Sequence, residues 1–158
     1  MRPILFIDRD GVVLEEPATD FQIDHIDKTI FVPGVISNLQ KIANDFGYYK
    51  VMVTNQDGLG TDVFPIATFQ PFQDLMVRTL KGEGFVFDEM HIDTTFAKDN
   101  AVTRKPGTGL VQHLMNDTQF DLSISYVIGD RWSDIELAKN IGCKAIYLKS
   151  NLHTLTAE

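Results

Sequence analysis

The chain has 158 residues, of which 44% are apolar and 23% charged, with 14 basic and 22 acidic side chains that give a net charge of −8. This length predicts a single domain, residues 1–158, whose core needs no disulfide or metal to be stable. The acidic charge argues against nucleic acid or an anionic membrane surface as a partner, because both attract basic faces.

Apolar runs and helical spacings alternate along the chain. Strands are predicted over Ile4–Ile7, Lys50–Val53, Glu89–Ile92, Ser125–Ile128 and the run "KAIYL" at 144–148. Helices are predicted within 33–47, over Ile66–Lys81, over Gly107–Asn116, and around 135–141. Strands that alternate with helices favour an α/β fold, a Rossmann-like parallel sheet with helices on both faces. In such sheets, ligands bind outside the carboxyl ends of the strands.

Three of the predicted strands run into polar residues at that end. Asp8 and Asp10 follow the first strand, Thr54 follows the second, and Asp130 follows the fourth. A single Asp after a strand is often a turn residue. Three such strand ends at one edge of a sheet favour a binding site instead.

These residues suit the chemistry of a phosphoryl group. Asp8, Asp10, Asp130 and Asp134 would form a cluster of oxygen ligands without His or Cys, which favours Mg²⁺. Thr54 and Lys105 would add a hydroxyl and a cation. Together such groups neutralise a transferring phosphoryl group and hold it in line. One carboxylate can act as the nucleophile, and a neighbouring carboxyl can act as the acid and base.

The same residues carry a family resemblance that extends over nearly the whole chain. "DRDGVV", Thr54 in "VMVTNQ", Lys105 and "GDRWSD" match in order the four motifs of the haloacid dehalogenase superfamily of phosphohydrolases. Longer segments, among them "DFQIDHIDK" and "TNQDGLGTDVFP", resemble the histidinol-phosphate phosphatases, including the phosphatase domain of the bifunctional enzyme of histidine biosynthesis. The resemblance implies a phosphoric monoester hydrolase that converts L-histidinol phosphate to L-histidinol and phosphate through an aspartyl-phosphate.

The resemblance also implies a role for each motif residue. Asp8 would be the nucleophile, and Asp10 the acid and base with a backbone carbonyl on Mg²⁺. Thr54 and Lys105 would hold the phosphoryl oxygens. The metal ligands would be Asp8, Asp10 and Asp130, with Asp134 supporting the metal or Lys105 from behind. The candidate substrate contacts are Arg9, Asn55, Gln56 and Arg104. No insertion of cap-domain size separates the motifs, so the fold is expected to lack a large cap domain.

One segment departs from the family pattern. Members of the family carry a zinc-bound loop, with three Cys and one His, just before the "RKP" that contains Lys105. The corresponding positions here are Asp93, Thr95, Ala101 and Thr103. Structural zinc needs four Cys or His ligands. The sequence therefore predicts no structural zinc in this loop, which packing of Phe96 and hydrogen bonds would hold instead.

Several alternatives stay open. The same mechanism could act on a sugar bisphosphate such as D-glycero-D-manno-heptose 1,7-bisphosphate. A signalling receiver module also combines acidic residues, a Thr and a Lys, although its order of motifs differs. A descendant that binds without catalysis is a further alternative. The chain could also act beside, or fused to, a dehydratase domain. The small phosphorylated substrate is common to both enzyme readings.

The remaining residues give weaker signals. The lone Cys143 and the missing signal-peptide pattern predict a cytoplasmic protein in which Cys143 is a buried apolar residue. Trp132 could flank the site, but a lone Trp at such a position more often packs on a helix, which is the expectation here. Acidic loop residues could face a substrate amine or could simply be solvated: Glu15, Glu16, Asp20, Asp24 and Asp57. None of the histidines shows metal-ligand spacing, and none is assigned to catalysis: His25, His91, His113 and His153.

Overall fold

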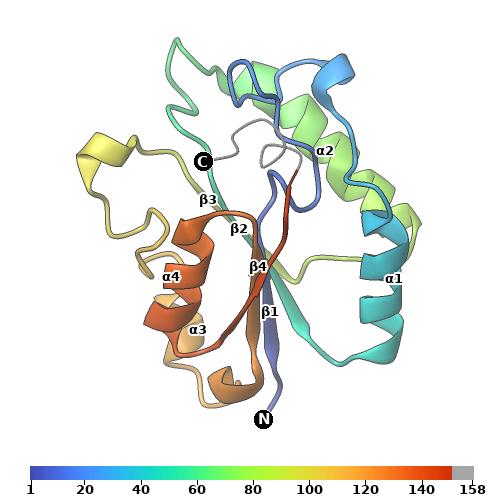
Figure 1. Ribbon diagram of the computed structural model, residues 1–158, viewed down its shortest axis with the longest axis vertical. Helices are drawn as coiled ribbons and strands as arrows, with labels where there is room; N and C mark the ends of the chain where they lie inside the picture. The colour runs from blue at the N-terminus through green and yellow to red at the C-terminus, as the bar shows by residue number, and fades with distance from the viewer. Residues whose placement is uncertain (151–158) are drawn as a thin grey trace.

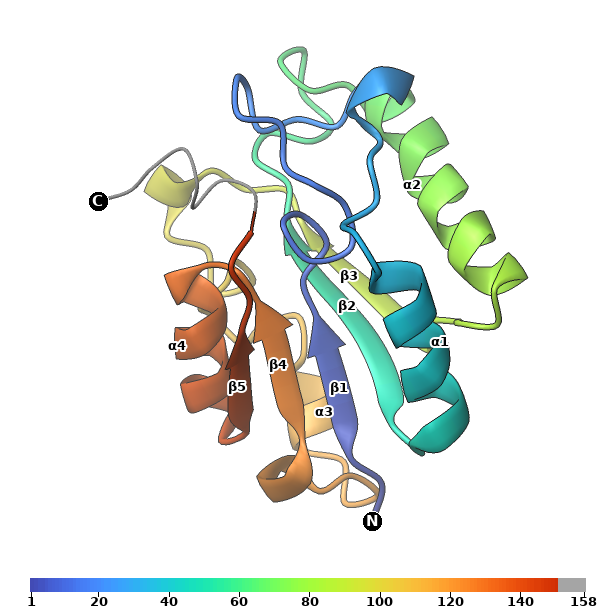
Figure 2. The same cartoon turned by 45° about the vertical axis from the view of Figure 1, so that its right-hand side comes forward.

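A five-stranded parallel sheet forms the centre of the protein. The structure is a computed structural model that describes residues 1–150. The strands are β1 (Ile4–Ile7), β2 (Tyr49–Asn55), β3 (Glu89–Asp93), β4 (Tyr126–Gly129) and β5 (Lys144–Tyr147). They lie in the order β3-β2-β1-β4-β5, and each neighbouring pair is parallel. All the strands therefore end at the same edge, from which the long loops extend (Figure 1, Figure 2). The predicted fold is confirmed.

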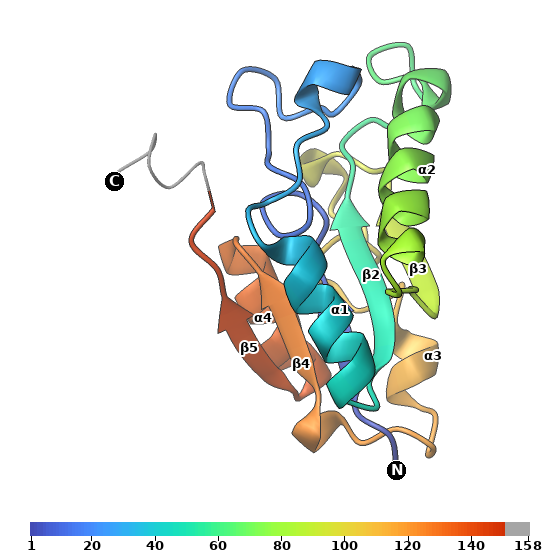
Figure 3. The ribbon, with the colours of Figure 1, turned by 90° about the vertical axis from the view of Figure 1, so that its right-hand side faces the viewer.

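Helices cover both faces of the sheet. Those with their bounds are α1 (Val35–Asp45), α2 (Ile66–Gly82), α3 (Gln112–Met115) and α4 (Trp132–Ile141). Helices α1 and α2 pack on one face, and α3 and α4 pack on the other (Figure 3). Three short 3-10 helices lie at Ile26–Lys28, Ala97–Asp99 and Leu122–Ile124.

The central strand β1 supplies side chains to both layers of the core. Ile4 and Phe6 belong to the cluster under α3 and α4, whereas Leu5 and Ile7 belong to the cluster under α1 and α2. All four are at most 3% exposed. A strand buried on both faces cannot alternate apolar with polar residues, which is why the sequence reads as one apolar run before Asp8.

The predicted helix over Gly107–Asn116 is wrong in its first half. Only α3 is helical, because the chain before it folds back on the preceding loop and does not continue as a helical turn. Gly107 N donates to Arg104 O at 2.6 Å, and Gly109 N donates to Val102 O at 2.9 Å. A Cβ at Gly107 would lie 2.3 Å from Val102 O. The two glycines let the chain fold back on the loop that carries Lys105.

Other expectations about single residues had mixed outcomes. Trp132 does not pack on a helix but begins α4 with 71% of its surface exposed. Phe46 falls within the range 33–47 predicted to contain a helix, but it lies just past the end of α1 in extended conformation and is 57% exposed. Cys143 is partly buried against the core, and burial raises the pKa of its thiol to about 12, so it resembles the inert apolar residue that was predicted.

The loops at the carboxyl edge are open. Within residues 1–150, the connection from β1 to α1 contains only one 3-10 turn and that from β2 to α2 contains no helix or strand, so neither forms a cap domain. No helix in this part of the chain combines the length and apolar character that a bilayer crossing requires.

Candidate active site

A cavity of about 310 Å³ lies at the carboxyl edge of the sheet. Its walls include Asp8 after β1, Thr54 near the end of β2, and Lys105 in the loop before α3. Strand β1 lies between β2 and β4, at the point where the strand order reverses. The connections on its two sides run in opposite directions, which leaves a crevice at its carboxyl end. The structure thus brings together residues from separate parts of the chain, as the sequence predicts.

Lys105 lies at the centre of the buried charges. Its Nζ is 2.8 Å from Asp8 Oδ1 and 2.7 Å from Asp134 Oδ1, and the Lys105 residue is 5% exposed. Burial alone would lower the pKa of this amine. The charges of Asp8 and Asp134 outweigh burial and raise it, so Lys105 stays protonated. One of its three ammonium protons remains beyond these two ion pairs for a further acceptor.

Three carboxylates crowd around this single cation. Asp8, Asp130 and Asp134 each have an oxygen within 4.8 Å of the others, and all three are buried. Burial, followed by the charge of Asp8, raises the pKa of Asp134 to about 6. Burial is also the main cause of the raised pKa of Asp130. The cluster therefore carries more negative charge than Lys105 can neutralise.

Asp130 and Asp134 differ in how their oxygens are used. Asp134 Oδ1 accepts from Lys105, and its Oδ2 accepts from the amide of Arg131 at the start of α4, at 3.0 Å. By contrast, Asp130 Oδ1 is buried and has no hydrogen-bond partner among the described residues. An all-oxygen set with one unpartnered buried carboxylate oxygen fits Mg²⁺.

Glycines keep space for these carboxylates. A Cβ at Gly11 would lie 2.2 Å from Asp130 Oδ2, and a Cβ at Gly129 would lie 2.2 Å from the Cβ of Asp134. Gly11 also has a φ of +76°, which residues with a side chain rarely adopt. These glycines let the backbone approach the acidic cluster closely.

Asp10 is held by two side chains that the sequence suggested as substrate contacts. Arg9 Nη1 donates to Asp10 Oδ1 at 2.7 Å, and Gln56 Nε2 donates to Asp10 Oδ2 at 2.5 Å. Burial is the largest influence on Asp10 and raises its pKa, while Arg9 opposes this and Asp8 reinforces it. Gln56 Nε2 also donates to Thr54 Oγ1 at 2.9 Å. The proton of the Thr54 hydroxyl can therefore be given to another acceptor.

Arg9 does not fit the role of a substrate contact. Its side chain is fully buried beside the ring of Phe69, with the guanidinium carbon 4.9 Å from the ring centroid, and it is not among the residues that line the cavity. The prediction that Arg9 contacts the substrate is therefore wrong, because Phe69 of α2 covers its side chain. Gln56 does line the cavity but has its amide on Asp10 and Thr54.

Asn55 and Arg104 flank the site on the other side of Lys105. Asn55 Oδ1 accepts from Lys105 N at 3.0 Å, and its Nδ2 donates to Lys105 O at 3.3 Å, so Asn55 holds the lysine backbone. Arg104 lines the cavity and pairs with both oxygens of Asp57 at 2.6 and 3.1 Å. Asn55 thus has a positioning contact, and Arg104 is available at the cavity wall.

A hydrogen-bonded clamp closes the loop in which zinc was not expected. Asp93 is 2% exposed and ends β3. Its Oδ1 accepts from the amide and hydroxyl of Thr95, at 2.9 and 2.6 Å, and its Oδ2 accepts from the Thr103 hydroxyl at 2.6 Å. Although burial pushes the pKa of Asp93 upward, these bonds keep it below its usual value. The Phe96 ring packs against Gly58 across the loop. Both supports predicted for this loop are present.

Removing this clamp should loosen the loop that carries Arg104. We expect Asp93→Ala to lower the free energy of unfolding by about 2 kcal/mol, because two hydroxyls lose their acceptor. In a thermal melt this corresponds to a decrease in Tm of about 4–8 °C. KM should rise more than kcat falls. Asp93→Asn keeps one acceptor oxygen and should lie between the two; equal Tm values for all three proteins would contradict the clamp.

One pair at the cavity was not found from the sequence. Arg131 Nη2 donates to both carboxylate oxygens of Glu16, although the two residues are 115 positions apart. Burial raises the pKa of Glu16 to about 7, with Arg131 opposing the rise. Glu16 was considered only as one of several acidic loop residues, since no local pattern indicates a partner so distant in the chain.

Similarity to known proteins agrees with this geometry. Residues 102–158 match the family model described as HAD-hydrolase-like. The histidine biosynthesis bifunctional protein HisB of Bacteroides fragilis is 49% identical over 154 residues, which is 98% of this chain and 41% of that protein. HisB of Spirosoma linguale is 49% identical over 92% of this chain and 38% of its own length. The chain thus spans about two-fifths of the length of the curated relatives it matches.

A solved structure extends the agreement to three dimensions. The D,D-heptose 1,7-bisphosphate phosphatase from B. bronchiseptica, crystallised with magnesium and phosphate, has a TM-score of 0.83 and 27% identity. The alignment covers 99% of this chain and 86% of that one. The family model, the sequence similarity over nearly the whole of this chain and the shared fold lead to the same conclusion. The chain belongs to the haloacid dehalogenase-like hydrolases.

Proposed function

We propose that this chain hydrolyses L-histidinol phosphate to L-histidinol and phosphate in a Mg²⁺-dependent reaction. The observation that carries the proposal is the placement of Asp8, Thr54 and Lys105 around one cavity, in a chain 49% identical to proteins named for histidine biosynthesis. The geometry supports the reaction class, and the relatives support the substrate.

The side chains of the site account for two transfers of the phosphoryl group, first to Asp8 and then to water. An oxygen of Asp8 attacks phosphorus, and the phosphorus–oxygen bond to the alcohol breaks. Asp10, whose pKa is raised by burial, gives its proton to the leaving oxygen. Asp10 then takes a proton from water as that water attacks the aspartyl-phosphate. The bond between phosphorus and Asp8 breaks, which releases phosphate and restores the carboxylate.

Other side chains hold the phosphoryl group during both transfers. Lys105 has one ammonium proton beyond its bonds to Asp8 and Asp134, and Thr54 can donate its hydroxyl proton. Gln56 keeps Asp10 oriented through the bond to its Oδ2. Preorganised donors of this kind stabilise developing charge without reorganising during the reaction.

Mg²⁺ would be held by Asp8, Asp130 and the backbone carbonyl of Asp10, while Asp134 supports Lys105. When bound, the ion would offset the negative charge of the phosphoryl group and of the carboxylates. The unpartnered Asp130 Oδ1 is the residue-level feature that supports this assignment. We also propose that the loop 93–103 holds no structural zinc.

A heptose bisphosphate is the second candidate substrate, because a phosphatase named for it shares the fold at 27% identity. Phosphate release from L-histidinol phosphate and from D-glycero-D-manno-heptose 1,7-bisphosphate separates the two. We expect a higher kcat/KM for histidinol phosphate, no turnover after EDTA treatment, and recovery with added Mg²⁺. Preference for the heptose would replace the substrate assignment, and full activity in EDTA would remove the metal from the proposal.

A further inference from the structure

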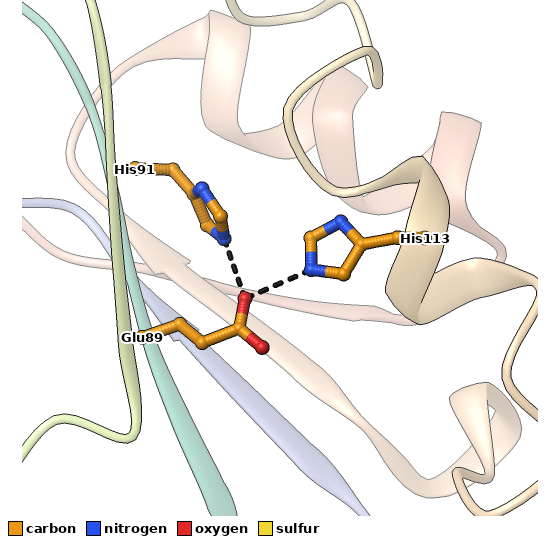
Figure 4. Close-up of side chains that lie close together, drawn as sticks. All are labelled: Glu89, His91 and His113. Atoms are coloured by element: carbon orange, nitrogen blue, oxygen red, sulfur yellow. Dashed lines mark hydrogen bonds and ion pairs between the residues drawn. The ribbon is translucent and has the colours of Figure 1, made fainter.

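Three potential metal ligands meet on the edge strand, away from the phosphatase cavity. Glu89 and His91 are two residues apart on β3 and point to the same face, and His113 reaches them from α3 (Figure 4). His91 Nε2 is 2.7 Å and His113 Nε2 is 2.9 Å from the same oxygen, Oε2 of Glu89. The three ligand atoms all lie within 4.8 Å of one another.

The carboxylate in this cluster is fixed from behind. The Tyr49 hydroxyl donates to Glu89 Oε1 at 2.8 Å, which leaves Oε2 directed toward the two imidazoles. Although burial pushes the pKa of Glu89 upward, the bonds from His113, Tyr49 and His91 hold it below its usual value. Glu89 is therefore an anion at neutral pH. Carboxylates that bind metal ions commonly accept a hydrogen bond from a neighbouring side chain in this way.

The cluster is open enough for an ion to enter. The side chains of Glu89 and His91 are 26% and 21% exposed, and that of His113 is 53% exposed. Strand register separates it from the phosphatase cavity. Glu89 pairs with Val51 and His91 with Val53, so both precede the level of Thr54 on the sheet.

We propose that Glu89, His91 and His113 bind a divalent transition-metal ion of the zinc class, with water completing the coordination. Two imidazoles and one carboxylate suit Zn²⁺, Co²⁺ or Ni²⁺ and do not suit Mg²⁺. Binding replaces the two Nε2···Oε2 hydrogen bonds, and each imidazole then carries its proton on Nδ1, which leaves Nε2 free to bind the ion. The ligand atoms are now separated by hydrogen-bond distances. These separations need to grow by only about half an ångström before one ion can lie about 2.0–2.2 Å from each atom.

Such an ion would join the edge strand directly to helix α3. Helix α3 has only four residues, and β3 is an edge strand. The segment between them carries Arg104 and Lys105. A metal bridge from β3 to α3 would therefore stabilise the base of the loop that supplies the cavity lysine. This site is distinct from the loop in which the sequence predicts no zinc, and it does not depend on the proposed substrate.

Zinc binding in a large excess of Mg²⁺ tests the proposal, because the excess Mg²⁺ is expected to fill the acidic cluster at the cavity. Calorimetry on the full chain should detect one Zn²⁺ site. His91→Gln and His113→Gln should each weaken it by about 100-fold or more, and Tyr49→Phe by about tenfold. His25→Gln removes an exposed histidine beside Asp27 and should leave binding unchanged. Asp130→Asn should also leave it unchanged.

Two outcomes would overturn the assignment. Unchanged zinc affinity in both His91→Gln and His113→Gln would show that the ion binds elsewhere, and loss of binding in Asp130→Asn would locate it in the phosphatase cavity. Because a variant could fail to fold, the wild-type chain provides a second measurement. Zn²⁺ should shift the imidazole NMR signals of His91 and His113 and not that of His25; the reverse pattern would contradict the site.

Discussion

Asp8→Asn should abolish phosphatase turnover while the protein stays folded. The amide has nearly the shape of the carboxylate but is a poor nucleophile, so the aspartyl-phosphate cannot form. We expect kcat to fall by at least about 10⁴-fold, with the residual rate coming from the groups that still hold the phosphoryl group. Release of phosphate under saturating substrate and Mg²⁺ measures this directly.

Stability should respond far less than activity. Asp8 is one of three buried carboxylates that surround Lys105, so neutralising it removes repulsion as well as one ion pair. Lys105 keeps its contact with Asp134. We therefore expect Asp8→Asn to melt within a few degrees of the unaltered protein, roughly a change of 1 kcal/mol. Such a melt would assign the loss of activity to chemistry.

A covalent intermediate gives the sharper readout. Acid quenching during turnover should trap one added phosphoryl group on the unaltered chain, located by peptide mass spectrometry at Asp8. Asp8→Asn should show none. Asp62→Asn removes an exposed aspartate in the loop before α2 and serves as the matched control, with full activity and a normal adduct. Appreciable turnover by Asp8→Asn, or an adduct at another aspartate, would remove Asp8 from its role.

The sequence predicted the sheet and the edge that carries the candidate site, because both leave local signals. A strand buried on both faces must be a run of apolar residues, and the polar residue that ends it then marks the edge of the sheet. Asp8, Thr54 and Asp130 could therefore be placed together before their distances were known. The parallel topology brings those strand ends to one edge of the sheet, which predicts that these residues lie near one another.

Features that depend on distant partners could not be predicted in the same way. The first half of the helix predicted before α3 is absent because the backbone at Gly107 and Gly109 bonds back to the loop at Arg104 and Val102, a turn that helical spacing of apolar residues does not reveal. In the sequence Arg9 looks like an exposed cation between two candidate catalytic aspartates, yet the Phe69 ring covers it. His91 and His113 are 22 positions apart in the chain, and only the packing of α3 against β3 brings them to one carboxylate.

Lys105→Met should have the largest effect on stability, because it leaves three buried carboxylates without their cation. Methionine matches the length of the side chain but supplies no charge, so Asp8 and Asp134 lose their common partner. Breaking a buried ion pair from one side costs about 3–5 kcal/mol. For a chain of this size the metal-free protein should then melt about 6–20 °C lower. Turnover should also fall by about 10²–10³-fold, since a donor to the phosphoryl group is lost.

Repulsion among the carboxylates leads to two further expected results for this variant. Added Mg²⁺ should recover part of its Tm, and Asp134→Asn in the Lys105→Met background should recover part without metal. The sign of the pH effect follows from Asp134, whose pKa is raised to about 6 in the unaltered protein although Lys105 lowers it, so removing Lys105 raises that pKa further. An acid with a raised folded-state pKa favours the folded state below its unfolded value, near 3.9, and loses that contribution as pH rises through the folded-state pKa. Lys105→Met therefore loses more of this contribution above pH 6 than the unaltered protein does.

The deficit in Tm of Lys105→Met should therefore be larger at pH 7.5 than at pH 5, where Asp134 is largely protonated in both proteins. Lys41→Met, on the exposed side of α1, is the matched control and should melt like the unaltered protein at both pH values. A Lys105→Met protein that melts normally in EDTA, with no response to Mg²⁺ or pH, would show that the acidic cluster does not need its lysine. Because the proposed site uses the same excess of negative charge to bind Mg²⁺, such a result would also remove the physical reason for the metal.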